Sequence, residues 1–176
     1  MPDFQSKDVV VKDRYIIDKP KLEDGFLIHE LIENCPPLDL NSSYAYLLQA
    51  SHFSATCRVA RLQEDPRQIA AYISGYCLPD QQDTLFIWQV AVSPNHRGRG
   101  LALCILQNLL IPQGRPAYRY LQTTVSPDNA ASIALFRRLA RDAGSVLQRQ
   151  DFYSSSLFGT SGHEAEDLYS IGPLYP

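Results

Sequence analysis

The most informative run of the sequence is Phe86-Ile87-Trp88-Gln89-Val90-Ala91-Val92-Ser93-Pro94-Asn95-His96-Arg97-Gly98-Arg99-Gly100-Leu101-Ala102. Its first seven residues are mostly β-branched or aromatic and alternate along the chain, which predicts a strand. A turn at Ser93-Pro94-Asn95 leads into Arg-Gly-Arg-Gly, and good helix formers continue from Leu101 to Leu110, before Pro112. The sequence therefore predicts a strand, a basic glycine turn and a helix in succession.

This glycine turn has the features of a diphosphate site. Gly98 and Gly100 carry no Cβ atom, so backbone N–H groups there can approach a ligand closely. They precede a helix, whose first N–H groups lack intrahelical partners and lie at the positive end of the helix dipole. Arg97 and Arg99 add positive charge. The alternative is a tight turn with solvated arginines. A Rossmann turn is excluded because position 103 is leucine, and the Gly-Lys-Ser/Thr ending of a P-loop is absent.

Composition predicts one soluble globular domain, residues 1–176, with a flexible N-terminus at residues 1–12. The chain is long enough for a sizeable core, and 45% of its residues are hydrophobic and 20% charged. The net charge of −3 indicates neither a nucleic-acid nor a membrane partner. The sequence shows no apolar segment of membrane-spanning length and no basic and apolar regions of a signal peptide. We therefore expect a cytoplasmic protein.

The four cysteines are widely spaced, and none forms a Cys-x-x-Cys pair. We therefore expect free thiols and no metal site. Cys104 falls within the apolar helix and is interpreted as a small core residue.

The rest of the chain alternates between strand and helix patterns, which predicts a mixed α/β fold. Ser126 is expected to cap the last helix, with Pro127 in its first turn. The strands at 57–61 and 68–76 are expected to pair as a hairpin, and residues 78–83 to form a loop. Strands are predicted near 15–17, 57–61, 68–76, 84–92, 118–125, 146–149 and 168–174, and helices near 22–32, 42–48, 97–110 and 126–143.

Two motifs resemble those of the GNAT superfamily of N-acetyltransferases. Residues 97–102 are similar to its Arg/Gln-x-x-Gly-x-Gly/Ala signature, which holds the pyrophosphate of acetyl-coenzyme A. Residues 129–136 resemble its second coenzyme motif, Asn-x-x-Ser/Ala-x-x-Leu-Tyr/Phe. The resemblance implies an α/β GNAT fold, with a mixed, strongly twisted central sheet flanked by helices, and acetyl-CoA bound where two strands splay. The residues it assigns to the coenzyme are Gln89, Val90, Ala91, Val92, Arg97, Gly98, Arg99, Gly100, Leu101, Ala102, Asn129 and Ser132.

Longer stretches resemble one branch of that superfamily, the L-2,4-diaminobutyrate acetyltransferases of ectoine biosynthesis. They are residues 36–48, 83–92, 121–125 and 157–159. The implied reaction moves acetyl from acetyl-CoA to the 4-amino group of L-2,4-diaminobutyrate and gives N4-acetyl-L-2,4-diaminobutyrate. The resemblance makes this a step in the synthesis of a compatible solute, ectoine, under osmotic stress. Homodimers are usual in this branch. A small diamino acid is then the expected partner, without nucleic acid, membrane or metal.

Asp39 is the first candidate to hold a substrate amine, with Tyr44 beside it. Trp88 is expected to wall the pocket or to face an ammonium group through its ring, and Thr123 is assigned to the substrate by the resemblance. The alternatives are a solvated helix cap for Asp39 and a core position for Trp88.

Glu164, with His163, is the candidate clamp or proton acceptor for the amine. The alternative is that residues 161–167 form a solvated loop. A backbone N–H near Val90 is expected to polarise the thioester carbonyl. Phe136 occupies a position where many GNAT members have a tyrosine that protonates the leaving thiolate, so that role has no candidate.

Other functions stay open at this point. The enzyme could acetylate another small amine, such as ornithine, lysine or a polyamine, or a protein N-terminus. The chain could also be a non-catalytic acyl-CoA sensor or a structural α/β module. A comparison of substrates and a test for thiol release separate these alternatives.

Overall fold

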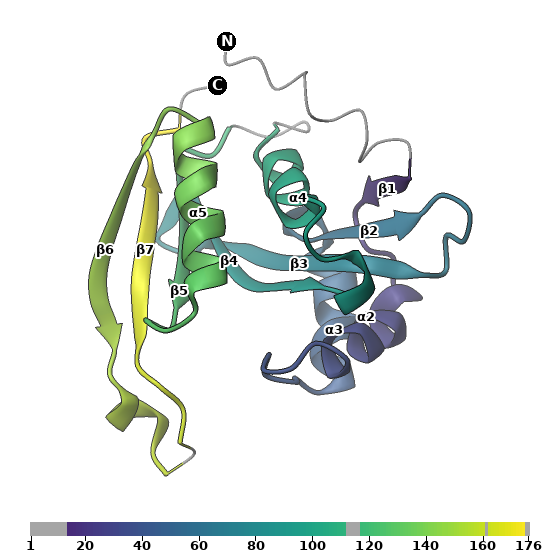
Figure 1. Ribbon diagram of the computed structural model, residues 1–176, viewed down its shortest axis with the longest axis horizontal. Helices are drawn as coiled ribbons and strands as arrows, with labels where there is room; N and C mark the ends of the chain where they lie inside the picture. The colour runs from purple at the N-terminus through teal and green to yellow at the C-terminus, as the bar shows by residue number, and fades with distance from the viewer. Residues whose placement is uncertain (1–13, 112–116, 161, 175–176) are drawn as a thin grey trace. The chain divides into compact units, whose positions relative to one another are not determined.

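The computed structural model describes residues 14–111, 117–160 and 162–174 (Figure 1). Strands and helices alternate as the sequence predicted, so the mixed α/β class is confirmed. The predicted N-terminal segment, residues 1–12, lies outside the described residues. The elements are β1 Tyr15–Asp18, α2 Asp24–Glu33, α3 Ser43–Ser51, η1 Ser54–Thr56, β2 Arg58–Leu62, β3 Ile69–Leu78, β4 Gln81–Val92, η2 Pro94–His96, α4 Leu101–Leu110, β5 Tyr120–Val125, α5 Ala130–Asp142, β6 Val146–Tyr153, η3 Ser155–Phe158 and β7 Glu166–Gly172.

The strands follow the order β1-β2-β3-β4-β5-β7-β6 in one sheet. The described residues divide into two compact units. The amino-terminal unit comprises residues 14–76 and 88–111, and the carboxy-terminal unit comprises residues 77–87, 117–160 and 162–174. Residues 88–92 of β4 thus belong to the first unit and residues 81–87 to the second. The single domain predicted from composition stays a prediction.

In the amino-terminal unit, α2 and α3 pack side by side (Figure 1). β1 pairs with β2, and β2 with β3, both antiparallel, which confirms the predicted hairpin. Ser42 caps α3, accepting a hydrogen bond from the Ala45 amide over 3.3 Å. The apolar faces of these helices and strands form one core. Its buried members are Ile28, Leu31, Ile32, Cys35, Tyr46, Cys57, Val59, Ile69, Tyr72 and Ala91.

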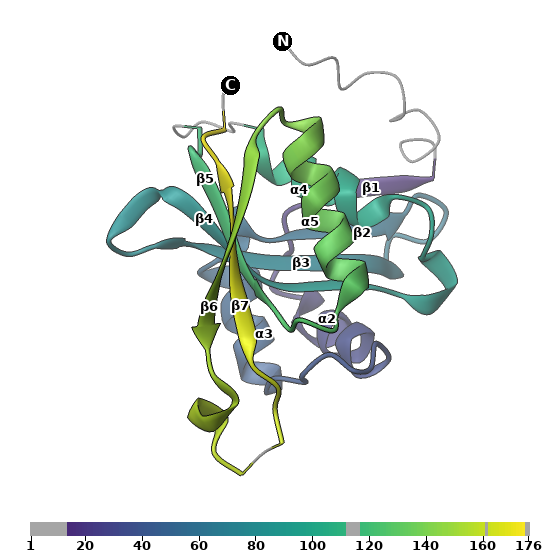
Figure 2. The same ribbon diagram turned by 60° about the vertical axis from the view of Figure 1, so that its left-hand side comes forward.

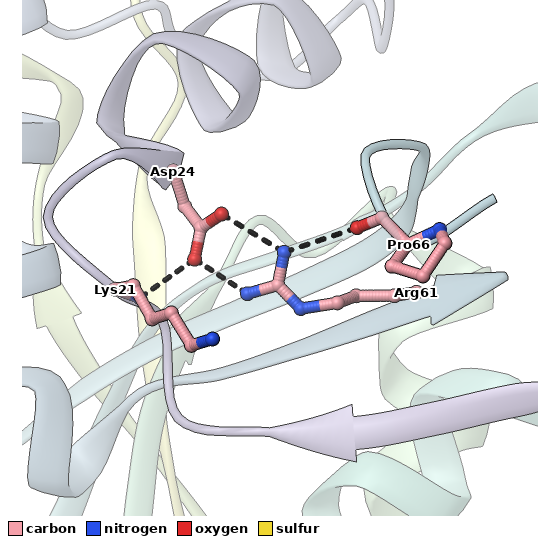
Figure 3. A network of polar contacts seen from close by, with 4 residues as sticks. All are labelled: Lys21, Asp24, Arg61 and Pro66. Atoms are coloured by element: carbon pink, nitrogen blue, oxygen red, sulfur yellow. Dashed lines mark hydrogen bonds and ion pairs between the residues drawn. The ribbon is translucent and has the colours of Figure 1, made fainter. Parts of the chain in front are cut away.

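A buried ion pair joins α2 to β2 in the same unit. Arg61 Nη1 and Nη2 donate to the two carboxylate oxygens of Asp24 over 2.8 and 2.5 Å (Figure 3). Asp24 also accepts from the Lys21 amide over 2.6 Å, and Arg61 donates to the Pro66 carbonyl over 3.4 Å. Burial raises the pKa of Asp24, but the hydrogen bonds from Arg61 and Lys21 outweigh it and hold that pKa below its ordinary value.

In the carboxy-terminal unit, β5 is the centre of the strand pairing. β4 pairs with β5 in parallel from Thr84 opposite Tyr120 to Ile87 opposite Thr123. This register ends at Ile87, and β4 itself continues to Val92. β7 pairs antiparallel with both β5 and β6. The amphipathic helix α5 packs on β6 and β7 (Figure 1, Figure 2), burying Phe136 and Leu139.

Three local predictions were wrong. The expected 78–83 loop is mostly strand, because β3 runs to Leu78 and β4 starts at Gln81. α5 starts at Ala130 and is capped by Asn129, whose Oδ1 accepts from the Ser132 amide over 3.1 Å. The expected Ser126 cap instead lies in the preceding turn, where its carbonyl accepts from the Asn129 amide. Cys104 is half-buried rather than a core residue. The strand expected to start at Val146 does start there, and β6 continues to Tyr153.

Candidate active site

The segment after β4 has the strand, turn and helix order expected from the sequence. β4 ends at Val92, η2 spans Pro94–His96, and α4 begins at Leu101. Gly98 and Gly100 have φ angles of 74° and 75°, in the left-handed region that residues with a Cβ atom rarely adopt. A Cβ atom at either position would meet no atom within 4 Å. The path of the backbone therefore requires these glycines, and space beside the loop is open.

The same loop presents hydrogen-bond donors and positive charge. In the described part of the chain no side chain caps α4, and its first-turn amides have no intrahelical acceptor. Arg97 and Arg99 are exposed. Arg97 Nε donates to the Val92 carbonyl over 3.1 Å, and Arg99 Nη2 donates to the Asn95 carbonyl over 3.4 Å. Oriented amides beside two guanidinium groups form a site that suits a diphosphate.

His96 anchors the start of this loop. Its Nδ1 lies 2.9 Å from the Tyr15 hydroxyl, and the two rings meet edge to face with centroids 5.7 Å apart. Burial, reinforced by the charges of Arg99 and Arg14, lowers the pKa of His96. The imidazole is therefore neutral near pH 7 and ties η2 to β1.

Gln89 joins β4 to the loop that carries Asp39. Its Nε2 donates to the Asp39 carbonyl over 2.7 Å, and its backbone N–H donates to Ser74 Oγ over 3.2 Å. Gln89 is 6% exposed, and its Oε1 has no hydrogen-bond partner among the described residues. The expected contact of Gln89 with the coenzyme stays a prediction. The hydrogen bond from Gln89 to the Asp39 loop was not expected from the sequence.

The three substrate candidates of the amino-terminal unit are open to solvent. Trp88 is 50% exposed and Tyr44 is 68% exposed, and Asp39 is exposed as well. The alternative of a core tryptophan is therefore wrong, because a buried ring would be covered by apolar neighbours. The rings of Trp88 and Tyr44 therefore present surface to solvent. On the same strand, Val90 and Val92 are half-buried and Ala91 is buried.

In the carboxy-terminal unit, Thr123 and Asn129 have clear structural partners. Thr123 is buried, and its Oγ1 donates to the Ile87 carbonyl over 3.0 Å, where the pairing of β4 and β5 ends. Asn129 is the cap of α5 and binds the amide of Ser132. Their expected contacts with substrate and coenzyme stay predictions.

His163 is held in a fixed orientation on the connection between β6 and β7. Its ring stacks on Phe158, with centroids 4.0 Å apart and planes 21° apart. Its Nδ1 lies 2.8 Å from the Glu164 carbonyl. Because a carbonyl oxygen only accepts, Nδ1 carries a proton. The other ring nitrogen, Nε2, is 3.9 Å from Glu166 Oε1.

Glu164 forms a carboxyl pair with Asp128. The hydrogen bond with the Asp128 side chain and the negative charge of that residue raise the pKa of Glu164, burial adds to the rise, and His163 opposes it. Both carboxyl groups are exposed. Two carboxyl groups this close also suit a cation such as an ammonium group, whose charge relieves their repulsion.

Sequence reasoning missed three residues at these positions. Asp128 was interpreted only as part of a helix start, although an acid beside a capping asparagine was visible. Phe158 was named only within the resembling stretch 157–159, because its stacking on His163 depends on how the connection folds back. Ser74 is an ordinary strand residue until its hydroxyl is seen to accept the Gln89 amide.

Residues 14–111, 117–160 and 162–174 contain neither a cluster of metal-ligating side chains nor a membrane-spanning helix. No group of three or more His, Cys, Asp or Glu side chains is placed to hold a metal. In the same residues, no helix combines the length and apolar character needed to cross a membrane. No disulfide joins the four cysteines in the described part of the chain.

Residues 26–140 match the profile of a family described as the acetyltransferase (GNAT) family. The chain belongs to the GNAT acetyltransferase family. This membership agrees with the glycine loop after β4, and it confirms the expected GNAT fold class.

Individual GNAT relatives are similar over most of the chain. The chain is 43% identical over 165 residues to the L-2,4-diaminobutyric acid acetyltransferase of Chromohalobacter salexigens, covering 94% of this chain and 84% of that protein. It is 45% identical over 158 residues to the enzyme of the same name from Vibrio parahaemolyticus, covering 90% and 86%. A similar solved structure is that of diaminobutyrate acetyltransferase EctA from Paenibacillus lautus, in complex with its substrate L-2,4-diaminobutyric acid and coenzyme A. The two chains superimpose with a TM-score of 0.86 and are 36% identical, and the match covers 92% of this chain and 96% of that one.

Proposed function

We propose that this protein transfers acetyl from acetyl-CoA to the 4-amino group of L-2,4-diaminobutyrate. The observation that carries the proposal is the match, over more than nine-tenths of the chain, to a GNAT enzyme whose structure holds both diaminobutyric acid and coenzyme A. The glycine loop and the exposed acidic and aromatic side chains supply the chemistry that such a reaction needs.

The loop after β4 holds the diphosphate of the coenzyme. The amides of residues 98–102 donate to the phosphate oxygens, and Arg97 and Arg99 balance their charge. The pantetheine arm runs along residues 89–92, with Asn129 and Ser132 as further contacts. The neutral His96 keeps η2 in place without adding a titrating charge.

Selection of the 4-amine depends on position rather than on basicity. A side-chain ammonium has a pKa of about 10.4, whereas an α-ammonium has one of about 7.7–8.0, so the α-amine is the better nucleophile in water near neutral pH. The enzyme must therefore hold the α-ammonium away from the thioester and bring the 4-amine to it. Asp39 and Tyr44 bind the substrate beside the ring of Trp88, and Thr123 is a further contact.

The reaction is a direct attack. The neutral 4-amine adds to the thioester carbonyl, whose oxygen accepts a hydrogen bond from the Val90 backbone N–H. The carbon–sulfur bond then breaks, and coenzyme A leaves as a thiolate. A thiol pKa near 8.5 makes that leaving group tolerable. Phe136 is 2% exposed and has no acidic hydrogen, so the thiolate takes its proton from solvent.

Glu164 receives the proton that the amine loses. When ionised, the Glu164 and Asp128 pair attracts the ammonium form of the substrate, and Glu164 then accepts its proton. His163 donates Nδ1–H to the Glu164 backbone and keeps this residue in place.

We also propose that the enzyme is a cytoplasmic homodimer. The four cysteines form no disulfide among the described residues, which is usual in a reducing compartment, and acetyl-CoA is a metabolite of the cell interior. The dimer is the state implied by the resemblance to the diaminobutyrate branch of the family.

A substrate panel tests the proposed activity. Release of free coenzyme A thiol is followed with L-2,4-diaminobutyrate, ornithine, lysine and diaminopropionate at equal acetyl-CoA. The proposal predicts the highest kcat/KM for diaminobutyrate. A preference for ornithine or lysine would point to another small-amine acetyltransferase, and binding of acetyl-CoA without thiol release to a sensor.

A further inference from the structure

We propose that β6 is the surface through which two copies of this chain pair, antiparallel, with the two-fold axis at Gln150. This inference goes beyond the proposed dimer by naming its face, and it does not depend on the proposed reaction.

β6 is an edge strand with unusual exposure. It stands at the end of the strand order, and the only strand that pairs with it in the described part of the chain is β7. Seven of its eight residues are exposed. An eight-residue edge offers a row of backbone N–H and C=O groups for a further strand. Val146, Phe152 and Tyr153 are exposed large apolar side chains on this strand, and Leu157 is another in η3 just after it.

Charges on β6 are not balanced within one copy. Asp151 lies directly opposite Asp167 in the β6–β7 pairing, a like-charge arrangement that is unfavourable. The one cation beside them, Arg149, is bonded to Asp167, with Nε 2.6 Å from Oδ2. Among the described residues Asp151 has no ion-pair partner of its own. An arginine that keeps its bond to its own Asp167 and also faces Asp151 of another copy would therefore improve the electrostatics of this face.

A second copy of β6 supplies that cation in one register. A two-fold axis perpendicular to a sheet places one residue opposite its own copy. With the axis at Gln150, Arg149 faces Asp151 of the second copy, and the reverse pair forms by symmetry. An axis at Arg149 or Asp151 would instead place like charges opposite one another, and an axis at Gln148 would place Arg149 opposite Leu147. Charge complementarity therefore selects Gln150.

The apolar residues support a second copy as the occupant. Leu147 and Gln148 of one strand then approach the Phe152–Tyr153 end of the other, where β6 bulges in its pairing with β7, so aromatic rings lie on both sides of the central charged pairs. The same residues would otherwise stay in water beside an unpaired edge, an arrangement that proteins usually avoid.

Single cysteines test the register directly. In Gln150→Cys the two new thiols face each other across the axis at a Cα separation of ~4.5–5.5 Å, within the range for a disulfide. In the matched variant Gln148→Cys, the two new cysteines lie four residues apart along the paired strands, about 13 Å. That separation is too long for a disulfide. Mild oxidation is expected to give covalent dimers of Gln150→Cys, but not of Gln148→Cys or of the wild-type protein with its four native cysteines.

Light scattering over a concentration series gives the second readout. Asp151→Arg is expected to weaken dimerisation at least tenfold, whereas Asp80→Arg, the same charge change on an exposed turn, leaves it unchanged. A dimer that shows no cross-link in Gln150→Cys would overturn β6 as the face and leave the dimer standing. A protein that stays monomeric at every concentration would overturn both the dimer and β6 as its face. Neither result bears on acetyl transfer, which is measured separately.

Discussion

Gln89 Nε2 donates a 2.7 Å hydrogen bond to the backbone carbonyl of Asp39. This bond ties the loop of the proposed amine-binding carboxylate to the strand that carries Trp88. Gln89 is itself fixed, because its backbone N–H donates to Ser74 Oγ. The position of Asp39 beside β4 therefore depends on a buried amide that need not touch the substrate.

Replacement of this amide should impair substrate binding. Gln89→Leu removes the bond to Asp39 and releases the loop, so KM for diaminobutyrate should rise about tenfold, equivalent to about 1.4 kcal/mol. KM for acetyl-CoA should change little, because the pantetheine arm is proposed to follow the backbone of residue 89 and not its side chain. Steady-state kinetics with each substrate varied in turn measures the two KM values separately.

The matched control is Gln68→Leu, the same change at an exposed position in the turn before β3. It should leave both KM values at the wild-type level. A rise in KM for acetyl-CoA alone in Gln89→Leu would contradict the anchoring role and favour a contact with the coenzyme.

The geometry of the glycine loop predicts that changes at Gly98 and Gly100 raise KM for acetyl-CoA. Gly98→Ala and Gly100→Ala force a Cβ atom into a left-handed backbone, at a cost of roughly 1–2 kcal/mol. The loop then moves, and KM for acetyl-CoA should rise about tenfold or more.

Gly144→Ala is the control for backbone strain alone. Gly144 has a φ of 63° and nothing within 4 Å of a Cβ atom, but it lies at the end of α5. Thermal denaturation should show similar losses of stability in all three variants. Equal effects on KM for acetyl-CoA in Gly144→Ala and Gly98→Ala would refute the specific role of the loop.

The carboxyl pair predicts a shift in the titration of Glu164. Because the hydrogen bond and charge of Asp128 raise the pKa of Glu164 above its ordinary value of 4.5, Asp128→Asn should move that titration to lower pH. Carbon-13 NMR of labelled glutamate carboxyls measures the midpoint. The same variant should raise KM for diaminobutyrate, and Glu164→Gln should lower kcat. An unchanged pH–rate profile in Glu164→Gln would remove Glu164 as the proton acceptor.

The buried Asp24–Arg61 pair predicts a large effect on stability. Asp24→Asn leaves the Arg61 charge buried without its partner, so the free energy of unfolding should fall by about 3–5 kcal/mol near neutral pH. Urea denaturation measures it, with Asp80→Asn as the exposed control.

The pH dependence of this effect has a definite sign. The pKa of Asp24 is lowered in the folded protein, so its contribution is complete above the ordinary value of 3.8 and is lost as the pH falls through the folded pKa. The difference between the wild-type protein and Asp24→Asn should therefore shrink below pH 3.8. A difference that is constant with pH would contradict the ion pair.

Local sequence patterns predicted most of the fold. The order of strands and helices followed from hydrophobic periodicity, and Gly98 and Gly100 indicated the turn because few other residues accept a positive φ. The cap of α5 was misplaced because Ser126 and Asn129 are both good caps, and the choice between them depends on how the turn packs.

The site was predictable only where one residue type is needed for the chemistry. Asp39 and Trp88 were named, and both are exposed. The bond from Gln89 to a backbone carbonyl and the Glu164–Asp128 pair were not predicted. Each joins residues far apart in sequence, and no local pattern records which of them meet.

The measurement that tests the central claim most directly is the position of the acetyl group in the product. The enzyme is incubated with acetyl-CoA and L-2,4-diaminobutyrate, thiol release is followed to completion, and the product is examined by two-dimensional NMR. We predict one acetyl group per thiol released, on the 4-nitrogen. Acetyl on the α-nitrogen, or no thiol release with this diamine, would contradict the proposed function.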